Sequence, residues 1–279
     1  MDFTRLVSSQ ARHRHRVGSR WQRSAVTAVL AVAALTLVAA APAGADARHR
    51  RAENEYHQTN LVSDVPGAAQ QTDPNLVNAW GMASGPSTPV WVSAADSGVA
   101  TIYKGAVSGS PLTIQPLVVT IPGGSPTGQV FNPTGGFVIT NGSVSAPAAF
   151  LFASEAGQIT GWSPTVPPST TAQPAVTTPD AIYKGLALAT TGSGSFLYAA
   201  NFHAGTVDVF DSSFAPVHKP GAFVDRKVPH GYAPFNVQQL NGSLYVTYAK
   251  QDAAPRTTSG ARGTASSTCS RLTGPWSAA

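Results

Sequence analysis

The sequence contains a single cysteine, Cys269, among 279 residues, which excludes any disulfide bond within the chain. A fold of this chain must therefore be stabilised by its apolar core alone. Charged residues are also scarce, at 11% of the sequence, whereas the chain has 26 Gly and 22 Pro. Such a composition is typical of a turn-rich β protein and does not fit a helical bundle or a disordered chain.

Basic residues are few in the central part of the chain, although the formal net charge is +5. Between Tyr56 and Asp252 there are six Lys or Arg and nine Asp or Glu. The basic excess lies before this region, as in the segment Arg48–Arg51, and after it. A nucleic-acid surface needs basic residues clustered on the fold itself, so the sequence predicts no nucleic-acid partner.

The N-terminus has the pattern of a signal peptide. Several arginines precede an apolar stretch from Ala25 to Ala41, and Ala43-Gly44-Ala45 then matches a cleavage site before Asp46. An uncleaved anchor is the alternative, but the stretch is short for a span of about 20 residues. We therefore predict a signal peptide at 1–45, a flexible segment at 46–55, and a secreted or cell-surface protein with no membrane span in its mature chain.

The region 56–252 contains a unit that recurs about every 45–55 residues, the size of one four-stranded propeller blade. Each copy combines a short strand near a Gly or Asn, an apolar strand, and a Gly-led strand ending on an aromatic residue. We expect strands at 78–83, 90–93 and 98–103; at 126–128, 136–140, 150–153 and 157–162; at 183–188, 196–200 and 205–211; and at 233–237 and 244–248. No amphipathic helix is predicted. The predicted fold is an all-β propeller of four-stranded blades, of which about four are readable.

Two dipeptides in this region predict tight turns. Asn241-Gly242 lies between two apolar runs, which is the pattern of a type I′ hairpin, and Asn141-Gly142 gives a weaker signal of the same kind.

The blade motifs resemble an uncharacterised family of exported bacterial propeller-like proteins, some of which carry a PEP-CTERM sorting signal. The matching runs begin at 56–64, 73–78 and Trp80-Gly81, and continue at 183–187, 202–206, 232–236 and 245–252. The resemblance implies a propeller of near six blades. It implies no established activity and no catalytic residues.

The composition changes abruptly after Asp252. The segment 253–279 has three Arg, no acidic residue and little apolar pattern, as expected for a disordered tail. A frameshift near Ala253 is the second interpretation. The shifted frame over Arg256–Ser270 permits Asp-Asp-Val-x-Gly-Pro-Gly-His-Gly-Phe-Val-Asp-Val-Phe, which repeats the pattern of an outer strand. On this hypothesis the chain is truncated from about six blades.

Loops that enter the innermost strands are the expected ligand site of a propeller, at the mouth of its central channel. The candidate ligand-binding residues are Asn78, Trp80, Lys184, His203, Tyr232 and Asn236. This set offers only two Asn oxygens to a hard cation, so no metal or other cofactor is predicted. Turn roles are an alternative for Asn78, Asn236 and His203, and Trp80 has a core position as its alternative.

The sequence contains no nucleophile elbow, zinc spacing, dinucleotide fingerprint or P-loop. We therefore predict a secreted binding or interaction module for an unknown extracellular ligand or protein, and leave open whether it is an enzyme. The alternative is a metal-dependent propeller hydrolase or lactonase. Fold alone does not separate these functions.

Overall fold

The computed structural model describes residues 58–218, 223–252 and 270–271, and they are all strand, turn or loop with no helix. Apart from residues 58 and 59, the described residues belong to one compact unit that begins at Asn60. The predicted signal peptide (1–45) and flexible segment (46–55) lie outside the described residues. The same holds for the predicted tail (253–279), apart from the two residues of β19. No helix among the described residues is long and apolar enough to span a membrane.

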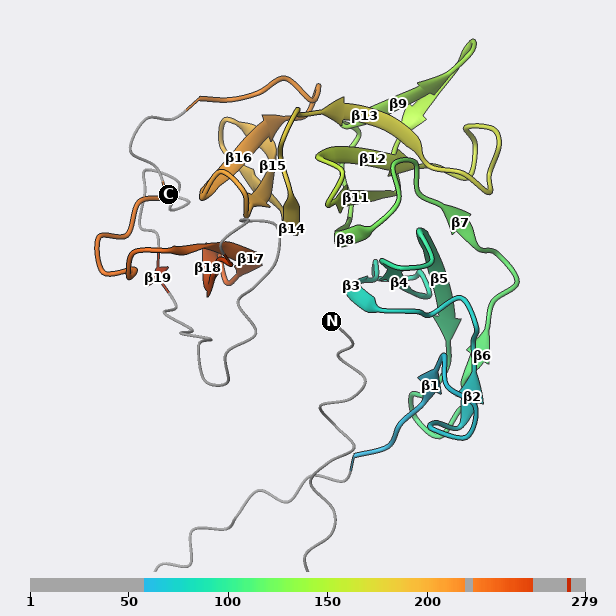
Figure 1. The fold of residues 1–279 in the computed structure, drawn as a ribbon. Coiled ribbons are helices and arrows are strands. Elements are labelled where there is room, and N and C mark those ends of the chain that lie inside the picture. Colours follow the sequence, from blue (N-terminus) through green and yellow to red (C-terminus); the bar gives the residue numbers. More distant parts are fainter. Residues whose placement is uncertain (1–57, 219–222, 253–269, 272–279) are drawn as a thin grey trace, which may run out of the picture. The chain divides into compact units, whose positions relative to one another are not determined.

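Four antiparallel sheets follow one another along the chain as propeller blades (Figure 1). Blade 1 contains β3 (Ala79–Ala83), β4 (Val90–Ala94), β5 (Val99–Lys104), β6 (Thr113–Ile114) and β7 (Val119–Thr120). Blade 2 contains β8 (Pro126–Phe131), β11 (Phe150–Ser154), β12 (Gln158–Trp162) and β13 (Gln173–Thr177). Blade 3 contains β14 (Tyr183–Thr191), β15 (Gly194–Asn201) and β16 (Thr206–Asp211), and blade 4 contains β17 (Tyr232–Leu240), β18 (Ser243–Lys250) and β19 (Ser270–Arg271). The predicted all-β propeller fold is confirmed, and its four sheets do not close into a ring.

Apolar side chains fill the space between neighbouring blades. Trp91 of blade 1 packs against Phe150 and Trp162 of blade 2, with ring centroids 4.4 and 4.6 Å apart. Leu151, on the opposite face of β11, belongs to the cluster shared with blade 3. Tyr198 of blade 3 belongs to the cluster shared with blade 4. Because successive side chains of a strand point to opposite faces, one apolar run supplies two of these interfaces.

A hairpin interrupts blade 2, and this corrects one sequence prediction. The segment 136–140 was expected to be a strand of the blade, but β9 (Val138–Asn141) pairs with β10 (Val144–Pro147) instead. The Asn141-Gly142 turn folds the chain back on itself there, so β11 takes the place beside β8. Val138 is consequently 48% exposed, whereas Ile139 is buried. The outermost strand β13 was not predicted.

Two further local features complete the described part of the chain. The Asn241-Gly242 turn joins β17 and β18, and both residues have positive φ (48° and 76°), as a type I′ turn requires. Before blade 1, β1 (Val62–Ser63) and β2 (Gln71–Thr72) form a short parallel pair. This segment is tied to blade 1 by a hydrogen bond of 2.8 Å from the Tyr103 hydroxyl to Asp73.

Candidate functional site

The innermost strand of each blade has a β-bulge at the same place. The register shifts at Trp80-Gly81 in β3, at Thr127-Gly128 in β8, at Lys184-Gly185 in β14 and at Phe235 in β17. A bulge leaves an extra residue outside the ladder and redirects its side chain. The four equivalent residues Trp80, Thr127, Lys184 and Phe235 all line one pocket between the inner strands.

Glycine follows the bulge residue in three blades because the next inner strand lies too close for a side chain. A Cβ on Gly81 would lie 2.2 Å from the Thr127 carbonyl oxygen, and one on Gly128 would lie 2.3 Å from the Leu186 nitrogen. A Cβ on Gly185 would lie 2.4 Å from the side-chain oxygen of Asn236. These close approaches between backbones bring the four bulge residues together.

Lys184 interacts with residues of several blades at one end of the pocket. Its side chain is 4% exposed and its ammonium forms an ion pair with Glu155, in the turn between β11 and β12. The same nitrogen lies 4.9 Å from the centre of the Trp80 ring and 5.9 Å from that of Phe202. Phe235 is 5.6 Å from both of these rings, centroid to centroid. Blades 1, 2 and 3 therefore contact this one ammonium group, and blade 4 packs against its aromatic neighbours.

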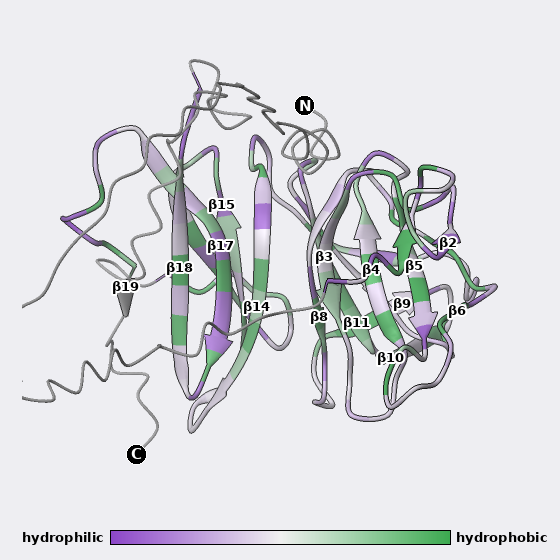
Figure 2. Cartoon of the chain, turned by 90° about the horizontal axis from the view of Figure 1, so that it is seen from below, coloured by the Kyte–Doolittle hydropathy of each residue, from purple (hydrophilic) through white to green (hydrophobic). Residues whose placement is uncertain are grey.

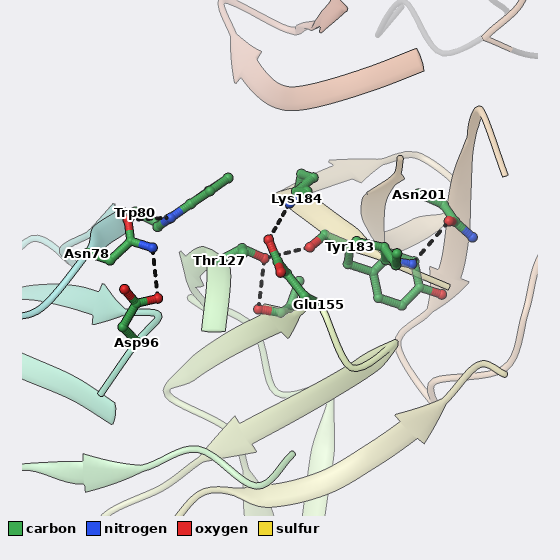
Figure 3. Close-up of polar contacts among 10 residues, drawn as sticks. Asn78, Trp80, Asp96, Thr127, Glu155, Tyr183, Lys184 and Asn201 are labelled. Atoms are coloured by element: carbon green, nitrogen blue, oxygen red, sulfur yellow. Dashed lines mark hydrogen bonds and ion pairs between the residues drawn. The ribbon is translucent and has the colours of Figure 1, made fainter. Parts of the chain in front are cut away.

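Trp80 is oriented by Asn78, which lies outside the pocket. The indole nitrogen of Trp80 donates a hydrogen bond of 3.0 Å to the Asn78 side-chain oxygen (Figure 3). The Asn78 amide donates in turn to Asp96, also over 3.0 Å. Asn78 has a φ of 55°, a conformation that asparagine tolerates better than most residues. Asp96 and Asn78 thus fix the angle at which the indole enters the pocket.

Hydrogen bonds also fix Thr127 and Tyr183, the residue before Lys184 (Figure 3). Tyr183 is fully buried and its hydroxyl donates a hydrogen bond of 3.0 Å to Asp208. This burial raises the pKa of the Tyr183 phenol far above its usual range. The Thr127 hydroxyl is within 2.8 Å of the Tyr183 carbonyl oxygen and 3.2 Å of that of Ala153. The bulges of β8 and β14 are thereby linked.

The pocket between the inner strands has a volume of about 850 Å³, in the range of small-molecule sites. Among the described residues, Lys184 is the only charged residue that lines it, and Glu155 compensates that charge. The other polar lining groups are amides and hydroxyls, namely those of Ser84, Gln129, Asn236, Gln238, Gln239 and Thr247 besides Thr127. In Figure 2, β17 is accordingly hydrophilic over its C-terminal half.

The structure brings together three of the six predicted ligand-binding residues, Trp80, Lys184 and Asn236, in this pocket. Asn78 supports Trp80 from outside. His203 is an exposed turn residue, and Tyr232 packs at the edge of the apolar cluster between blades 3 and 4. Neither lines the pocket, and a ligand-binding role for any of the six stays a prediction.

Four contributions to the site were not predicted from the sequence, namely those of Phe202, Phe235 and Gln129 and the ion pair of Glu155. Phe235 could have been found from the repeat, because Phe235-Asn236 aligns with Trp80-Gly81 and Lys184-Gly185. Trp80 had been weighed as a core residue, but it lines the pocket, whereas Trp91 and Trp162 are core. Within the described ranges, no three His, Cys, Asp or Glu residues gather in an arrangement that could hold a metal ion.

The comparisons with known proteins give relatives without an established function. No protein-family model matches the chain. Uncharacterized protein R648 of Acanthamoeba polyphaga mimivirus is 32% identical over 73% of the chain, and uncharacterized protein L690 of the same virus is 30% identical over 73%. The chain spans about half the length of these relatives, 51% and 54%. Both relatives are viral proteins, so they do not support the predicted resemblance to an exported bacterial family.

A solved structure with partial similarity is the virginiamycin B lyase of Staphylococcus aureus. It is 12% identical, with a TM-score of 0.41, over 60% of this chain and 47% of the lyase. This chain is thus similar in sequence to two mimivirus proteins, and its four described blades have the architecture of a β-propeller.

Proposed function

We propose that this protein is a binding module that holds a small extracellular molecule in the pocket between its inner strands. One observation carries the proposal: four separate blades each place their bulge residue, Trp80, Thr127, Lys184 or Phe235, at the same pocket. A repeat that only had to build a core would not need an irregularity at this point in every inner strand. Bulges recur in proteins where a side chain must be aimed at a site.

The contacts around the pocket support binding more than catalysis. Lys184 is paired with Glu155 and lies near two aromatic rings, so its ammonium already has partners within the protein. The remaining lining groups, amides and hydroxyls, form hydrogen bonds without titrating in the physiological range.

No specific observation favours the alternative of a metal-dependent hydrolase. Such an enzyme needs several carboxylate or imidazole groups that converge on one point. The described blades contain no such group of three, as reported above. The alternative therefore has no site in this part of the chain.

Export is the second part of the proposal, and its support is the leader pattern of residues 1–45. Edman sequencing of the protein recovered outside the cytoplasm should begin at Asp46. A protein that retains Met1 in the cytoplasmic fraction would contradict export, without affecting the proposal for the pocket.

The pocket itself is tested by filling it. Ser84 is exposed and lines the pocket, whereas the nearby Ser87 is exposed and does not. A panel of neutral sugars, small carboxylates and amino acids is screened by thermal shift with wild type, Ser84→Trp and Ser87→Trp. A probe at 100 times its Kd should stabilise wild type and Ser87→Trp by about 2.7 kcal/mol. Ser84→Trp should lose this stabilisation.

Two outcomes contradict a ligand pocket. One is that no probe stabilises the wild-type protein, and the other is that Ser84→Trp responds as strongly as wild type.

A further inference from the structure

The lining of the pocket restricts which chemical class of molecule it can hold. Phosphorylated and polyanionic molecules need several cations, but the described part of the chain gives the pocket one ammonium, already paired with Glu155. Cationic molecules need a carboxylate, and none of the described residues brings one to the pocket lining. A purely apolar molecule would remove water from lining amides such as those of Gln238 and Gln239 without replacing its hydrogen bonds, which is costly. A neutral molecule rich in hydrogen-bonding groups remains.

One buried hydrogen-bond donor points to an acceptor that the described residues do not supply. Gln129 lines the pocket and is only 6% exposed. Its side-chain oxygen accepts a hydrogen bond of 2.7 Å from the Ser93 hydroxyl. Its side-chain nitrogen has no partner among the residues described here. Since buried donors are nearly always satisfied in folded proteins, this donor calls for an acceptor, and the residue that carries it lines the pocket.

The opposite wall provides further amides. Gln238 and Gln239 belong to β17, in blade 4, whereas Gln129 belongs to β8, in blade 2. A side-chain amide both donates and accepts, so it matches the paired hydroxyls of a sugar ring, which do the same. Aromatic rings lie at the end of the pocket, where Trp80 and Phe235 are 5.6 Å apart. The flat C–H face of a sugar packs against such rings through weak polar contacts and apolar burial.

We propose that the pocket binds a neutral carbohydrate. The ring packs against Trp80 and Phe235, and its hydroxyls bond to Gln129 on one side and Gln238 on the other. Lys184 contributes a donor without demanding an anion, because Glu155 already balances its charge. This inference rests on the proposed function and assigns its substrate class.

Isothermal titration of the full chain with defined sugars tests the inference. The probes are tetramers of glucose in β-1,4 and α-1,4 linkage, the tetramer of N-acetylglucosamine, and galactose. Citrate and a mixture of uncharged tripeptides serve as probes of other classes. At least one sugar should bind wild type, and Trp80→Leu and Gln238→Ala should each weaken it, by about tenfold for a lost hydrogen bond or ring contact. The control Gln115→Ala changes a glutamine whose side-chain amide donates to Thr113, away from the pocket, and should bind as wild type does.

Each other outcome overturns a definite part of the reasoning. If no sugar binds but citrate or the tripeptides bind and Ser84→Trp abolishes that binding, the carbohydrate inference fails and the binding module stands. If a sugar binds equally well to Trp80→Leu and Gln238→Ala, the assigned contacts are wrong. If no probe of any class binds, both the inference and the proposed function fail.

Discussion

Replacing Lys184 by methionine should destabilise the propeller, because it removes an ammonium group that contacts residues of three blades. Methionine keeps most of the apolar side chain, so the loss reports the ammonium. The Lys184 side chain is 4% exposed and Glu155 is 35% exposed, so water can reach the carboxylate that is left behind. The cost therefore lies between about 0–1 kcal/mol for an exposed pair and about 3–5 kcal/mol for a broken buried one.

The aromatic contacts add to this cost. An ammonium 4.9 Å from the centre of the Trp80 ring contributes about 0.5–2 kcal/mol, towards the upper end when it is desolvated. We expect Lys184→Met to lower the free energy of unfolding by about 2–3 kcal/mol in total. The measurement is urea unfolding monitored by circular dichroism, with an unchanged m-value as the check that the unfolding reaction is the same.

A double-mutant cycle separates the ion pair from the packing. Glu155→Gln is combined with Lys184→Met, and the pair should show a coupling of about 1–2 kcal/mol. Lys104→Met, at an exposed lysine, is the matched control and should change stability by less than about 0.5 kcal/mol. The reasoning is refuted if Lys184→Met costs no more than Lys104→Met, or if the two substitutions at Lys184 and Glu155 are additive.

Three further substitutions test the packing around the pocket. Gly128→Ala should lower the free energy of unfolding in urea by about 1–3 kcal/mol, because its Cβ would lie 2.3 Å from a backbone nitrogen. Gly135→Ala is the control, because a Cβ there would have no atom within 4 Å. Equal effects of the two substitutions would contradict the close approach of the strands. Asn78→Ala should cost about 1–2 kcal/mol more than Asn78→Gly, since both lose the hydrogen bond from Trp80 but only alanine is strained at a φ of 55°. Burial raises the pKa of Tyr198 to about 12. The folded state therefore binds the phenolic proton of Tyr198 more tightly than the unfolded state does. The contribution of this proton to the free energy of unfolding is present below pH 10 and is lost as the pH rises towards 12. Tyr198→Phe should make the decline of stability at alkaline pH shallower. It should cause no loss of stability at pH 7, because the buried hydroxyl has no hydrogen-bond partner among the described residues. A loss of stability above about 1 kcal/mol at pH 7 would show that the hydroxyl has a partner.

The strands of the blades could be predicted from sequence because their local signals agree. The run 90–93 became β4, and Gly98–Tyr103 became β5 with its leading glycine in the turn. Apolar runs bounded by Gly and Asn turns are informative here, since central strands such as β11 and β15 are buried on both faces. The same apolar pattern gave a wrong prediction for the segment 136–140, which contains β9 of the separate hairpin. Its apolar pair Val138-Ile139 looks like a central strand, yet only Ile139 is buried.

The polar contacts of the pocket could not be predicted in the same way, because they join residues distant in the sequence. Glu155 and Lys184 are 29 residues apart, and Ser93 and Gln129 are 36 apart. Each pair meets only because a turn or second strand of one blade lies beside the inner strand of the next. The repeat fixes which positions are equivalent, but the distance between blades decides which of them touch.

Because of the bulges, the side chains that line the pocket can differ between blades without changing the pairing of the strands. A residue that sits at a bulge lies outside the regular ladder, so its identity does not set the strand register. The repeat already shows this, with tryptophan, threonine, lysine and phenylalanine at the four equivalent positions. On the proposed function, a lineage of such chains can change its ligand through these four positions without altering the strand register, while the glycines behind three of them keep the blades in place.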